Sequence, residues 1–207
     1  MALTLIRPSA HRVMPWKNGG GSTAEIAIHP PGASVVQGFD WRLSIATVAG
    51  DGPFSAFPRH DRVIILLSGA GMALRFDDGE SVGLDRPFQP RSFAGDRAAS
   101  CHLIGGPCQD LNLMIARGIA HSTAVLDGAE WTWGEVGATR ILFMLRGDAA
   151  CRGTAAPGRP PSPLALRPRD TLIVAPGEPP PEIRTEPGSL GFAIDIGAGA
   201  GLATGTP

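Results

Sequence analysis

The 207-residue chain lacks tyrosine altogether, carries only three cysteines and has a formal net charge of -1 at neutral pH. This balanced charge gives no general reason to expect nucleic acid or an anionic membrane as a partner. No stretch approaches the roughly 20 apolar residues that a membrane-spanning helix needs. The first apolar run stops at Arg7 and Pro8, so no signal peptide is predicted. These absences predict a cytoplasmic protein without nucleic-acid or membrane partners.

The cysteines do not indicate a disulfide framework. Cys101, Cys108 and Cys151 are odd in number and form no C-x-x-C pair. A chain of this length can bury a sizeable core without disulfide or metal staples. The cysteines are therefore predicted to be buried, reduced thiols.

The five histidines are scattered and include no H-x-H, H-x-x-E or H-x-x-x-H pair: His11, His29, His60, His102 and His121. A zinc or iron site needs three or four converging donors, commonly including such a pair. The sequence therefore predicts no metal and no other cofactor. A site assembled from distant residues stays open.

Nucleophilic catalysis has no sequence signature either. There is no G-x-S-x-G motif, and Cys101 and His102 are adjacent residues whose side chains point to opposite faces of a strand. His102 is more typical of a hydrogen-bonded strand histidine than of a general base. No catalytic residue is predicted.

What the chain has in abundance is glycine and proline, 28 and 20 residues, together with period-2 alternation. Residues 41–46 alternate apolar with small or polar side chains, and in 110–115 Asp110, Asn112 and Met114 face one way. Short strands joined by many turns fit this pattern. An all-β fold is predicted, with one short helix at residues 118–126.

Two segments of the chain resemble each other. "RVIILLSG" at 62–69 and "RILFMLRG" at 140–147 share an opening Arg, an apolar run of five and a closing Gly. This echo predicts duplication of one β-unit, although a chance match of apolar strands stays open. The predicted domains are residues 1–120 and 121–207, with a Pro-rich loop at 154–163 and a flexible tail at 198–207.

The stretch "WKNGGG", Trp16 to Gly21, resembles a phosphate-binding loop only formally. The G-x-G-x-x-A pattern works when a helix follows it, whereas here a strand pattern follows and ends in two prolines. Two interpretations remain. The glycines allow close backbone approach while Lys17 and Asn18 face a cavity, or the stretch is a simple bend with an exposed lysine.

Three cations sit at or beside predicted strands: Lys17, Arg42 and Arg62. Isolated strand arginines usually pair with structural carboxylates, and Asp40, Asp61 or Asp110 are candidates. Together with neighbouring tryptophan, asparagine and threonine side chains, the three cations are also suited to a pocket for a small carboxylate.

Four motifs between about residues 14 and 118 together resemble the HutD/Ves family of small bacterial bicupins: "WKNGGGST", "FDWRLSIATVAGDGPFSAFPRHDRVIILLSGAG", "SFAGD" and "DLNLMIARG". The resemblance implies tandem cupin β-barrels, or jelly rolls, with short helical connections. It also implies a non-catalytic protein that moderates histidine utilisation by binding urocanate or N-formylglutamate. The metal-binding set of other cupins is missing, as it generally is in this family. A homodimer is a further candidate assembly.

By resemblance, the first barrel carries the ligand pocket, with Arg42 and Arg62 clamping the carboxylate and Trp16 or Trp41 stacking on the ligand. The implied ligand-binding residues are Trp16, Lys17, Asn18, Thr23, Arg42, Arg62, Phe93, Asp110 and Asn112. Arg59 stands where the family commonly has glycine, which is expected to alter the pocket rim. The alternatives are an enzyme acting on a similar acid, with Lys17 or His102 as base or with a cryptic metal, and a purely structural β-domain.

Overall fold

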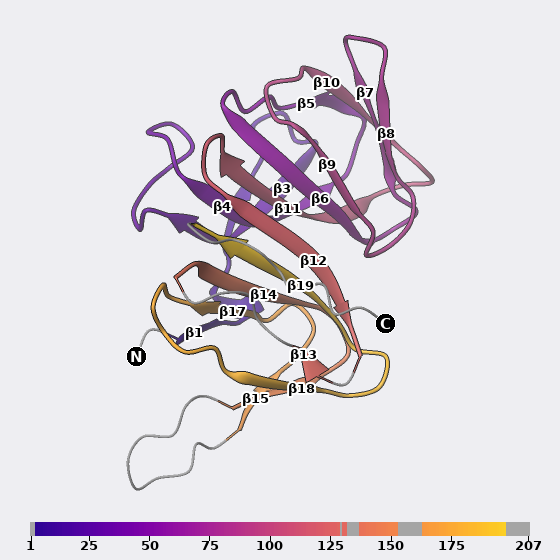
Figure 1. The fold of residues 1–207 in the computed structure, drawn as a ribbon. Helices are drawn as coiled ribbons and strands as arrows, with labels where there is room; N and C mark the ends of the chain where they lie inside the picture. The colour runs from indigo at the N-terminus through magenta and orange to yellow at the C-terminus, as the bar shows by residue number, and fades with distance from the viewer. Residues whose placement is uncertain (1–2, 129, 132–136, 153–162, 198–207) are drawn as a thin grey trace, which may run out of the picture. The chain divides into compact units, whose positions relative to one another are not determined.

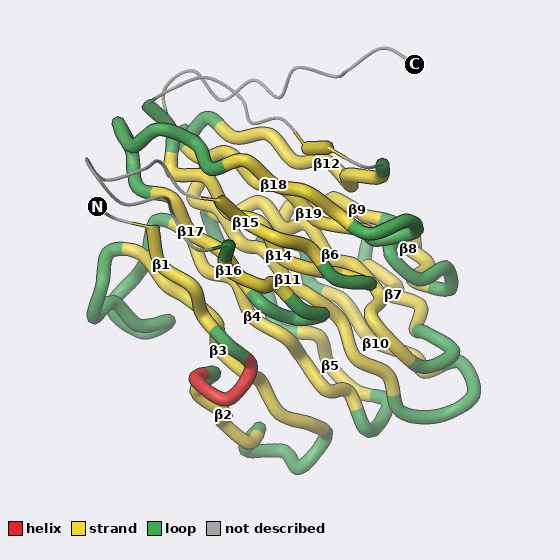
Figure 2. Tube along the Cα trace, turned by 90° about the horizontal axis from the view of Figure 1, so that it is seen from below, coloured by secondary structure: helices red, strands yellow, loops and turns green. Residues whose placement is uncertain are grey.

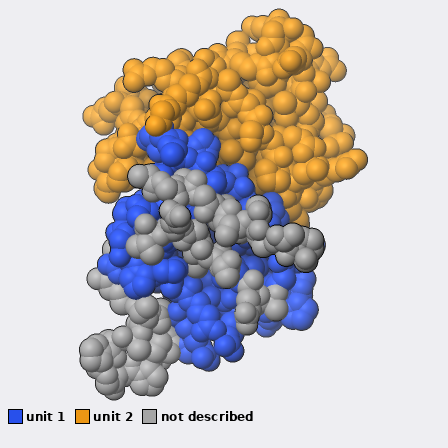
Figure 3. Space-filling view, viewed as in Figure 1, with its two compact units in different colours: residues 1–9, 119–207 blue, residues 10–118 orange. Residues whose placement is uncertain are grey.

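The computed structural model describes residues 3–128, 130–131, 137–152 and 163–197. The chain divides into two compact units (Figure 3). Unit 1 comprises residues 1–9 and 119–207, and unit 2 comprises residues 10–118. The described residues are almost entirely strand and loop, with a 3-10 helix at Pro8–Ala10, red in Figure 2. None of the described helical residues form a segment long and apolar enough to cross a bilayer.

Unit 2 is built from two antiparallel sheets (Figure 1). The six-stranded sheet runs in the order β2 (Arg12–Pro15), β3 (Gly21–His29), β4 (Trp41–Val48), β11 (Cys108–Ala116), β6 (His60–Ser68) and β9 (Pro90–Ala94). The four-stranded sheet runs β5 (Gly52–Phe54), β10 (Ala99–Leu103), β7 (Met72–Phe76) and β8 (Ser81–Leu84). A buried apolar cluster contributed by both sheets forms the core.

Unit 1 repeats this two-sheet plan. Its five-stranded sheet runs β1 (Leu3–Ile6), β17 (Thr171–Val174), β14 (Thr139–Arg146), β19 (Leu190–Ile196) and β12 (His121–Asp127). The second sheet runs β13 (Glu130–Trp131), β18 (Glu182–Thr185), β15 (Ala149–Arg152) and β16 (Leu164–Leu166). Because β1 pairs with β17, the first strand belongs to the unit formed by the C-terminal half, unlike in the predicted 1–120 domain.

The echo between the two segments extends to their closing glycines. Gly69 and Gly147 follow β6 and β14, and both have positive φ, 92° and 70°. A Cβ on Gly69 would lie 2.6 Å from the Pro107 carbonyl oxygen, and one on Gly147 would lie 2.3 Å from Ser189 Oγ. Glycine is therefore required for the same reason in both units. The chain turns tightly against the start of the neighbouring strand in the sheet, β11 in unit 2 and β19 in unit 1.

The two segments also share a backbone hydrogen bond, which is accepted by the residue four positions after the opening arginine. The Leu66 carbonyl accepts a hydrogen bond from the Phe88 amide at 3.0 Å, and the Met144 carbonyl accepts one from the Arg169 amide at 2.7 Å. Phe88 and Arg169 both have positive φ, 63° and 72°, which is uncommon for residues other than glycine. Matched turns of this kind favour duplication over a chance match of apolar strands.

The short helix predicted at residues 118–126 is wrong. Residues His121 to Asp127 form β12, paired along its length with β19. β-Branched Thr123 and Val125 favour the extended backbone, and the edge of β19 supplies the hydrogen bonds that a helix would have made internally. Residues 154–162 of the predicted loop and the predicted tail 198–207 lie outside the described residues.

The prediction that the three cysteines are buried, reduced thiols is confirmed. Cys101, Cys108 and Cys151 are buried and form no disulfide. Burial raises the pKa of the Cys108 and Cys151 thiols to about 11. They are therefore neutral, inert core residues at neutral pH.

Candidate functional site

The "WKNGGG" stretch forms the tight connection between β2 and β3. The Trp16 amide donates to the Gly21 carbonyl at 2.9 Å, and Gly19 has a φ of 71°. A Cβ on Gly21 would lie 2.1 Å from the Thr47 carbonyl oxygen and 3.0 Å from the Trp16 ring. The turn thus brings the backbone of Gly21 against β4 and places the Trp16 indole against Gly21. This geometry supports the close-approach interpretation of the glycines.

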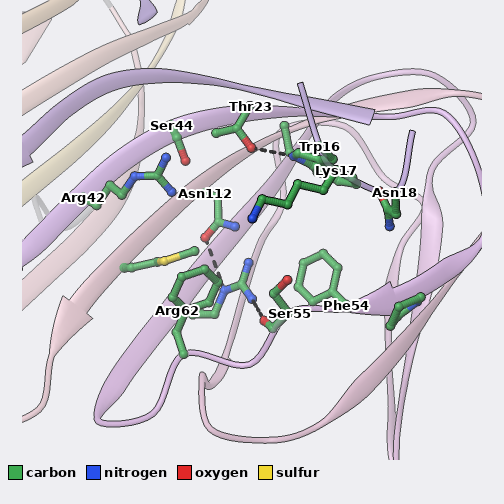
Figure 4. Close-up of a pocket in the computed structure, with 14 residues that line it drawn as sticks. Trp16, Lys17, Asn18, Thr23, Arg42, Ser44, Phe54, Ser55, Arg62 and Asn112 are labelled. Atoms are coloured by element: carbon green, nitrogen blue, oxygen red, sulfur yellow. Dashed lines mark hydrogen bonds between the residues drawn. The ribbon is translucent and has the colours of Figure 1, made fainter. Parts of the chain in front are cut away.

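A cavity of about 380 Å³ opens beside this turn, entirely within unit 2 (Figure 4). This volume lies within the range of small-molecule sites, about 300–1,000 Å³. The lining residues come from the turn, from β3, β4, β6 and β11, and from the β5 region: Trp16, Lys17, Asn18, Thr23, Arg42, Ser44, Ala46, Pro53, Phe54, Ser55, Phe57, Arg62, Asn112 and Met114.

Strand register places the polar groups of this cavity. Met114 on β11 lies opposite Arg42 on β4 and opposite Arg62 on β6. The two arginines therefore lie on the same face of the sheet with β11 between them, roughly 10 Å from Cα to Cα. Asn112 lies in the next row, beside Ser44. The alternation of side chains along each strand thus collects cations and amides on the inner face.

Arg62 is a desolvated cation at this cavity, with 3% of its surface exposed. Its Nε donates to Asn112 Oδ1 at 3.4 Å and its Nη1 to the Ser55 carbonyl at 3.0 Å. Its guanidinium carbon lies 4.4 Å from the ring centre of Phe54 and 5.2 Å from that of Phe57. Within the described part of the chain, no carboxylate lies at ion-pair distance from it. Burial lowers its pKa to about 10, so the guanidinium remains charged.

Arg42 has a different environment because the protein supplies its counter-ion. Its Nε donates to Glu25 Oε2 at 2.8 Å, and both side chains are largely buried. Glu25 is placed by an irregularity in the β3–β4 register between Glu25 and Ala27. The charge of Arg42 is therefore balanced by a direct ion pair before any ligand arrives, whereas Arg62 has no such pair among the described residues and feels only the longer-range charge of Asp110.

Three side chains, those of Trp16, Lys17 and Asn18, define the turn side of the cavity. The Trp16 indole N–H donates to Thr23 Oγ1 at 2.8 Å, which fixes the ring. Lys17 points into the cavity toward Asn112 (Figure 4). Asn18 Oδ1 accepts from the Gly20 amide at 3.0 Å and thereby stabilises the turn. Lys17 is thus a second cation beside Arg62.

Seven of the nine predicted site residues line this one cavity: Trp16, Lys17, Asn18, Thr23, Arg42, Arg62 and Asn112. Phe93 does not line it. It packs against the core and against Arg62, with the guanidinium carbon 5.4 Å from its ring centre. Asp110 is also absent from the wall and lies fully buried on the inner face of β11, beyond Asn112. These two residues support the cavity from behind.

Two other expectations about the rim need correction. Trp41 lies on the opposite face of β4 from Arg42 and stacks on His29, with ring centres 5.7 Å apart, so it is not a ligand-stacking residue. Arg59 has a φ of 68° and does not line the cavity. Its backbone geometry is one that glycine adopts without strain, so the glycine that the resemblance leads one to expect at this position needs no role in the pocket rim.

Sequence reasoning did not select Phe54, Ser55, Phe57 or Glu25. The first three lie in "GPFSAFP", a Gly- and Pro-rich segment without a regular period. The only available signal was two aromatic residues three apart in a segment that otherwise reads as loop. Glu25 had no signal, because its approach to Arg42 depends on the strand register.

The enzyme alternatives receive little geometric support from the histidines. His102 lies on the outer face of β10, with Ser100 Oγ 3.2 Å from its Nε2 and Asp51 Oδ2 3.4 Å from its Nδ1. It is 41% exposed and away from the cavity. In the portion of the chain that the structure describes, no group of three or more His, Cys, Asp or Glu side chains is arranged to hold a metal ion.

Comparison with solved structures defines the class of protein first. The fold matches that of protein Ylba from E. coli with a TM-score of 0.69, covering 94% of this chain and 90% of that chain at 9% identity. Oxalate decarboxylase from Lactobacillus farciminis matches with a TM-score of 0.60 at 8% identity, covering 93% and 85%. The chain is therefore a nearly all-β protein with the cupin-like fold, as predicted.

The chain belongs to the HutD family, whose model matches residues 8–188. HutD from Pseudomonas fluorescens SBW25, solved in a formate condition, is 32% identical with a TM-score of 0.78, covering 95% of this chain and 98% of that one. A conserved protein of unknown function from Pseudomonas aeruginosa PAO1 is 33% identical with a TM-score of 0.80, covering 96% and 100%. The resemblance noted in the sequence is confirmed.

A curated relative is also similar over part of the chain. A 21.2 kDa protein in the hutC 3' region of Pseudomonas putida is 43% identical over 114 residues. That match covers 55% of this chain and spans 58% of the relative's length.

Proposed function

We propose that unit 2 binds a small carboxylate catabolite, urocanate or N-formylglutamate, and that binding moderates histidine utilisation without catalysing a step. The protein would act in the cytoplasm, where such a catabolite is produced and consumed. The proposal concerns one cavity in one unit, and the charge environment of a single residue carries it.

That residue is Arg62. A charged group removed from water costs free energy unless it is paired and hydrogen-bonded. Arg62 is almost completely buried, yet its protein partners are a neutral amide and a backbone carbonyl. The surrounding phenylalanine rings offset only part of the lost hydration. A bound carboxylate would supply the missing counter-ion, and the planar guanidinium fork matches its geometry.

The other residues around the cavity suit the same ligand. Lys17 adds a second cation, and Thr23, Ser44 and Asn112 add neutral hydrogen-bonding groups. Arg42 contributes mainly through the guanidinium nitrogens that Glu25 leaves unoccupied. The primary clamp is therefore Arg62 with Lys17, rather than the predicted pair of Arg42 with Arg62.

Two features of the relatives support the histidine context. The family name is shared with HutD of P. fluorescens, and the P. putida relative lies in a hutC 3' region. The P. fluorescens structure belongs to a formate condition, and formate is the smallest carboxylate. It is a useful probe of how little ligand the Arg62 site requires.

The test is calorimetric titration with N-formylglutamate, urocanate and histidine, with Arg62→Gln compared with Arg75→Gln. Arg75 is an exposed arginine on β7 of the same unit, so it controls for loss of one positive charge. Loss of a charge-assisted contact should weaken affinity about 10- to 100-fold in Arg62→Gln only. Absence of binding by any of these acids, or equal weakening in both variants, contradicts the proposal.

One further measurement separates binding from turnover. NMR spectra of each acid incubated with the protein should remain unchanged over hours. Conversion of the acid would favour the alternative of a metal-independent enzyme with Lys17 as base, and stoichiometric metal in elemental analysis would favour a metalloenzyme.

A further inference from the structure

Asp110 is a buried carboxylate behind the cavity that none of the roles described so far uses. It is fully buried, and neither carboxylate oxygen has a hydrogen-bond partner among the described residues. Its side chain shares the inner face of β11 with Asn112 and Met114, which both line the cavity. A native protein rarely leaves such a group without a partner, so its position needs an explanation.

The charged and titratable groups around Asp110 are few. Arg62 lies on the same inward face of the sheet and reaches from β6 to Asn112, the next inward-facing residue after Asp110; Cys108 precedes Asp110 on β11, and Cys101 lies on β10. Farther along the same face lie the Arg42–Glu25 pair on β4 and β3, Lys17 in the turn, and His60 at the start of β6. Arg62 is the one among these whose charge acts directly on the Asp110 carboxyl.

Asp110 is set to change its protonation near neutral pH. Burial raises its pKa to about 7, while the Arg62 charge opposes that rise. Burial keeps the thiols of Cys101 and Cys108 neutral over the same range, with pKa values raised to about 12 and about 11. The positive charge of Arg62 therefore stabilises the ionised form of Asp110, and a second anion bound to Arg62 would weaken this stabilisation.

We infer that Asp110 sets the charge that the pocket accepts: when an anionic ligand binds Arg62, the Asp110 carboxylate takes up one proton from solvent. This inference rests on the proposed carboxylate binding by unit 2. Two anions cannot both be stabilised by one buried guanidinium in a low-dielectric interior. The ligand carboxylate, in direct contact with Arg62, offsets the charge that otherwise favours the ionised form of Asp110 from a greater distance, and the added proton leaves Asp110 neutral.

The sign of the pH dependence follows from proton linkage. Below about pH 7 Asp110 already carries its proton. Ligand binding therefore causes no net uptake or release of protons in that range. Above about pH 7 each binding event must take up a proton, so affinity falls with rising pH, by up to about tenfold per unit. From about pH 6 to about pH 8.5, affinity for N-formylglutamate should fall roughly 10- to 30-fold.

The experiment is isothermal titration calorimetry of the full-length protein with N-formylglutamate and with formate, whose carboxylates do not titrate in this range. Two buffers of different ionisation enthalpy at about pH 8 give the proton count on the unmodified protein. About one proton should be taken up per ligand bound. In Asp110→Asn the uptake should vanish, and affinity should be the same at about pH 6 and about pH 8.5.

The matched control is Asp77→Asn, an exposed aspartate in the turn after β7, which should keep both the uptake and the pH dependence. Binding without proton uptake by the unmodified protein overturns the role of Asp110 and leaves the proposed function standing. Uptake that persists in a folded Asp110→Asn variant assigns the proton to another group and also overturns it. Absence of binding by either acid at every pH overturns the proposed function and this inference together.

Discussion

Arg62 and Arg140 occupy corresponding positions in the two units, at the start of β6 and β14, and both are buried. Their cross-strand neighbours differ. Arg140 lies opposite Asp195 on β19, whereas Arg62 lies opposite Met114 on β11. At the position opposite the arginine, unit 1 has a carboxylate, whereas unit 2 has an apolar side chain beside a cavity and carries its own buried carboxylate, Asp110, four residues before Met114 on β11.

This difference suggests how a duplicated unit gains a binding site. A buried arginine needs a counter-ion, and the fold can supply one internally or leave the position to a ligand. Unit 1 resembles the first solution: the buried Asp195 stands opposite Arg140, and the charge of Arg140 opposes the rise that burial causes in the pKa of Asp195, although neither Asp195 oxygen has a hydrogen-bond partner among the described residues. Unit 2, under the proposed function, uses the second at Arg62.

The largest expected effect is on the stability of unit 1. Arg140→Met removes a fully buried cation and leaves Asp195 buried without it. The free energy of unfolding should fall by roughly 3 kcal/mol, measured by urea denaturation. Arg140→Met combined with Asp195→Leu should recover part of this loss, and a change below about 1 kcal/mol in the single variant would show that the two residues are not coupled.

Placing a carboxylate opposite Arg62, as unit 1 has opposite Arg140, should abolish the binding site of unit 2. Met114→Asp places a carboxylate opposite Arg62, as Asp195 lies opposite Arg140. Affinity for N-formylglutamate should fall more than about tenfold, because the pocket then contains its own counter-ion. Met114→Asn is the uncharged control in calorimetry, and equal loss in both variants would point to lost packing instead.

The shared glycine turns offer a test of the duplication itself. Gly69→Ala and Gly147→Ala should each destabilise the protein by about 2 kcal/mol, because both combine positive φ with close neighbours. Gly79→Ala is the control: its φ is also positive, but a Cβ there would meet nothing within 4 Å. It should cost only about 1 kcal/mol in the same urea titrations.

Asp110 gives unit 2 a stability that depends on pH. Its pKa, about 7 in the folded protein, is near 4 in an unfolded chain. Between these values the folded state holds more protons, so stability falls as pH rises through this window and stays low above it. Asp110→Asn should raise the melting temperature at about pH 8 by several degrees and have least effect near pH 4. A lower melting temperature at both values would contradict this.

The smallest expected effect concerns Arg59. Arg59→Gly relieves a positive φ at an exposed residue outside the cavity and should stabilise the protein by about 0.5–1 kcal/mol. Ligand affinity should remain unchanged in calorimetry. A changed affinity would restore this turn to the pocket rim.

Local patterns determined a large part of this protein. Period-2 alternation predicted the strands and the inward face of β11, because a pleated backbone sends successive side chains to opposite sides. The short segment at residues 118–126 was misassigned, because local propensity there does not reveal the edge of β19 with which it pairs. The four linked motifs predicted the family, and seven of the nine residues transferred from it line one cavity.

The sequence by itself therefore determined the all-β class, the family and most of the cavity wall. Only the tertiary structure decided which charges are paired. Arg42 and Arg62 look equivalent in the sequence, but strand register and one irregularity in β3 bring Glu25 to Arg42 and methionine to Arg62. The same register places Asp110 behind the cavity. Whether a charge is paired or buried depends on contacts between residues far apart in the chain, which no local pattern specifies.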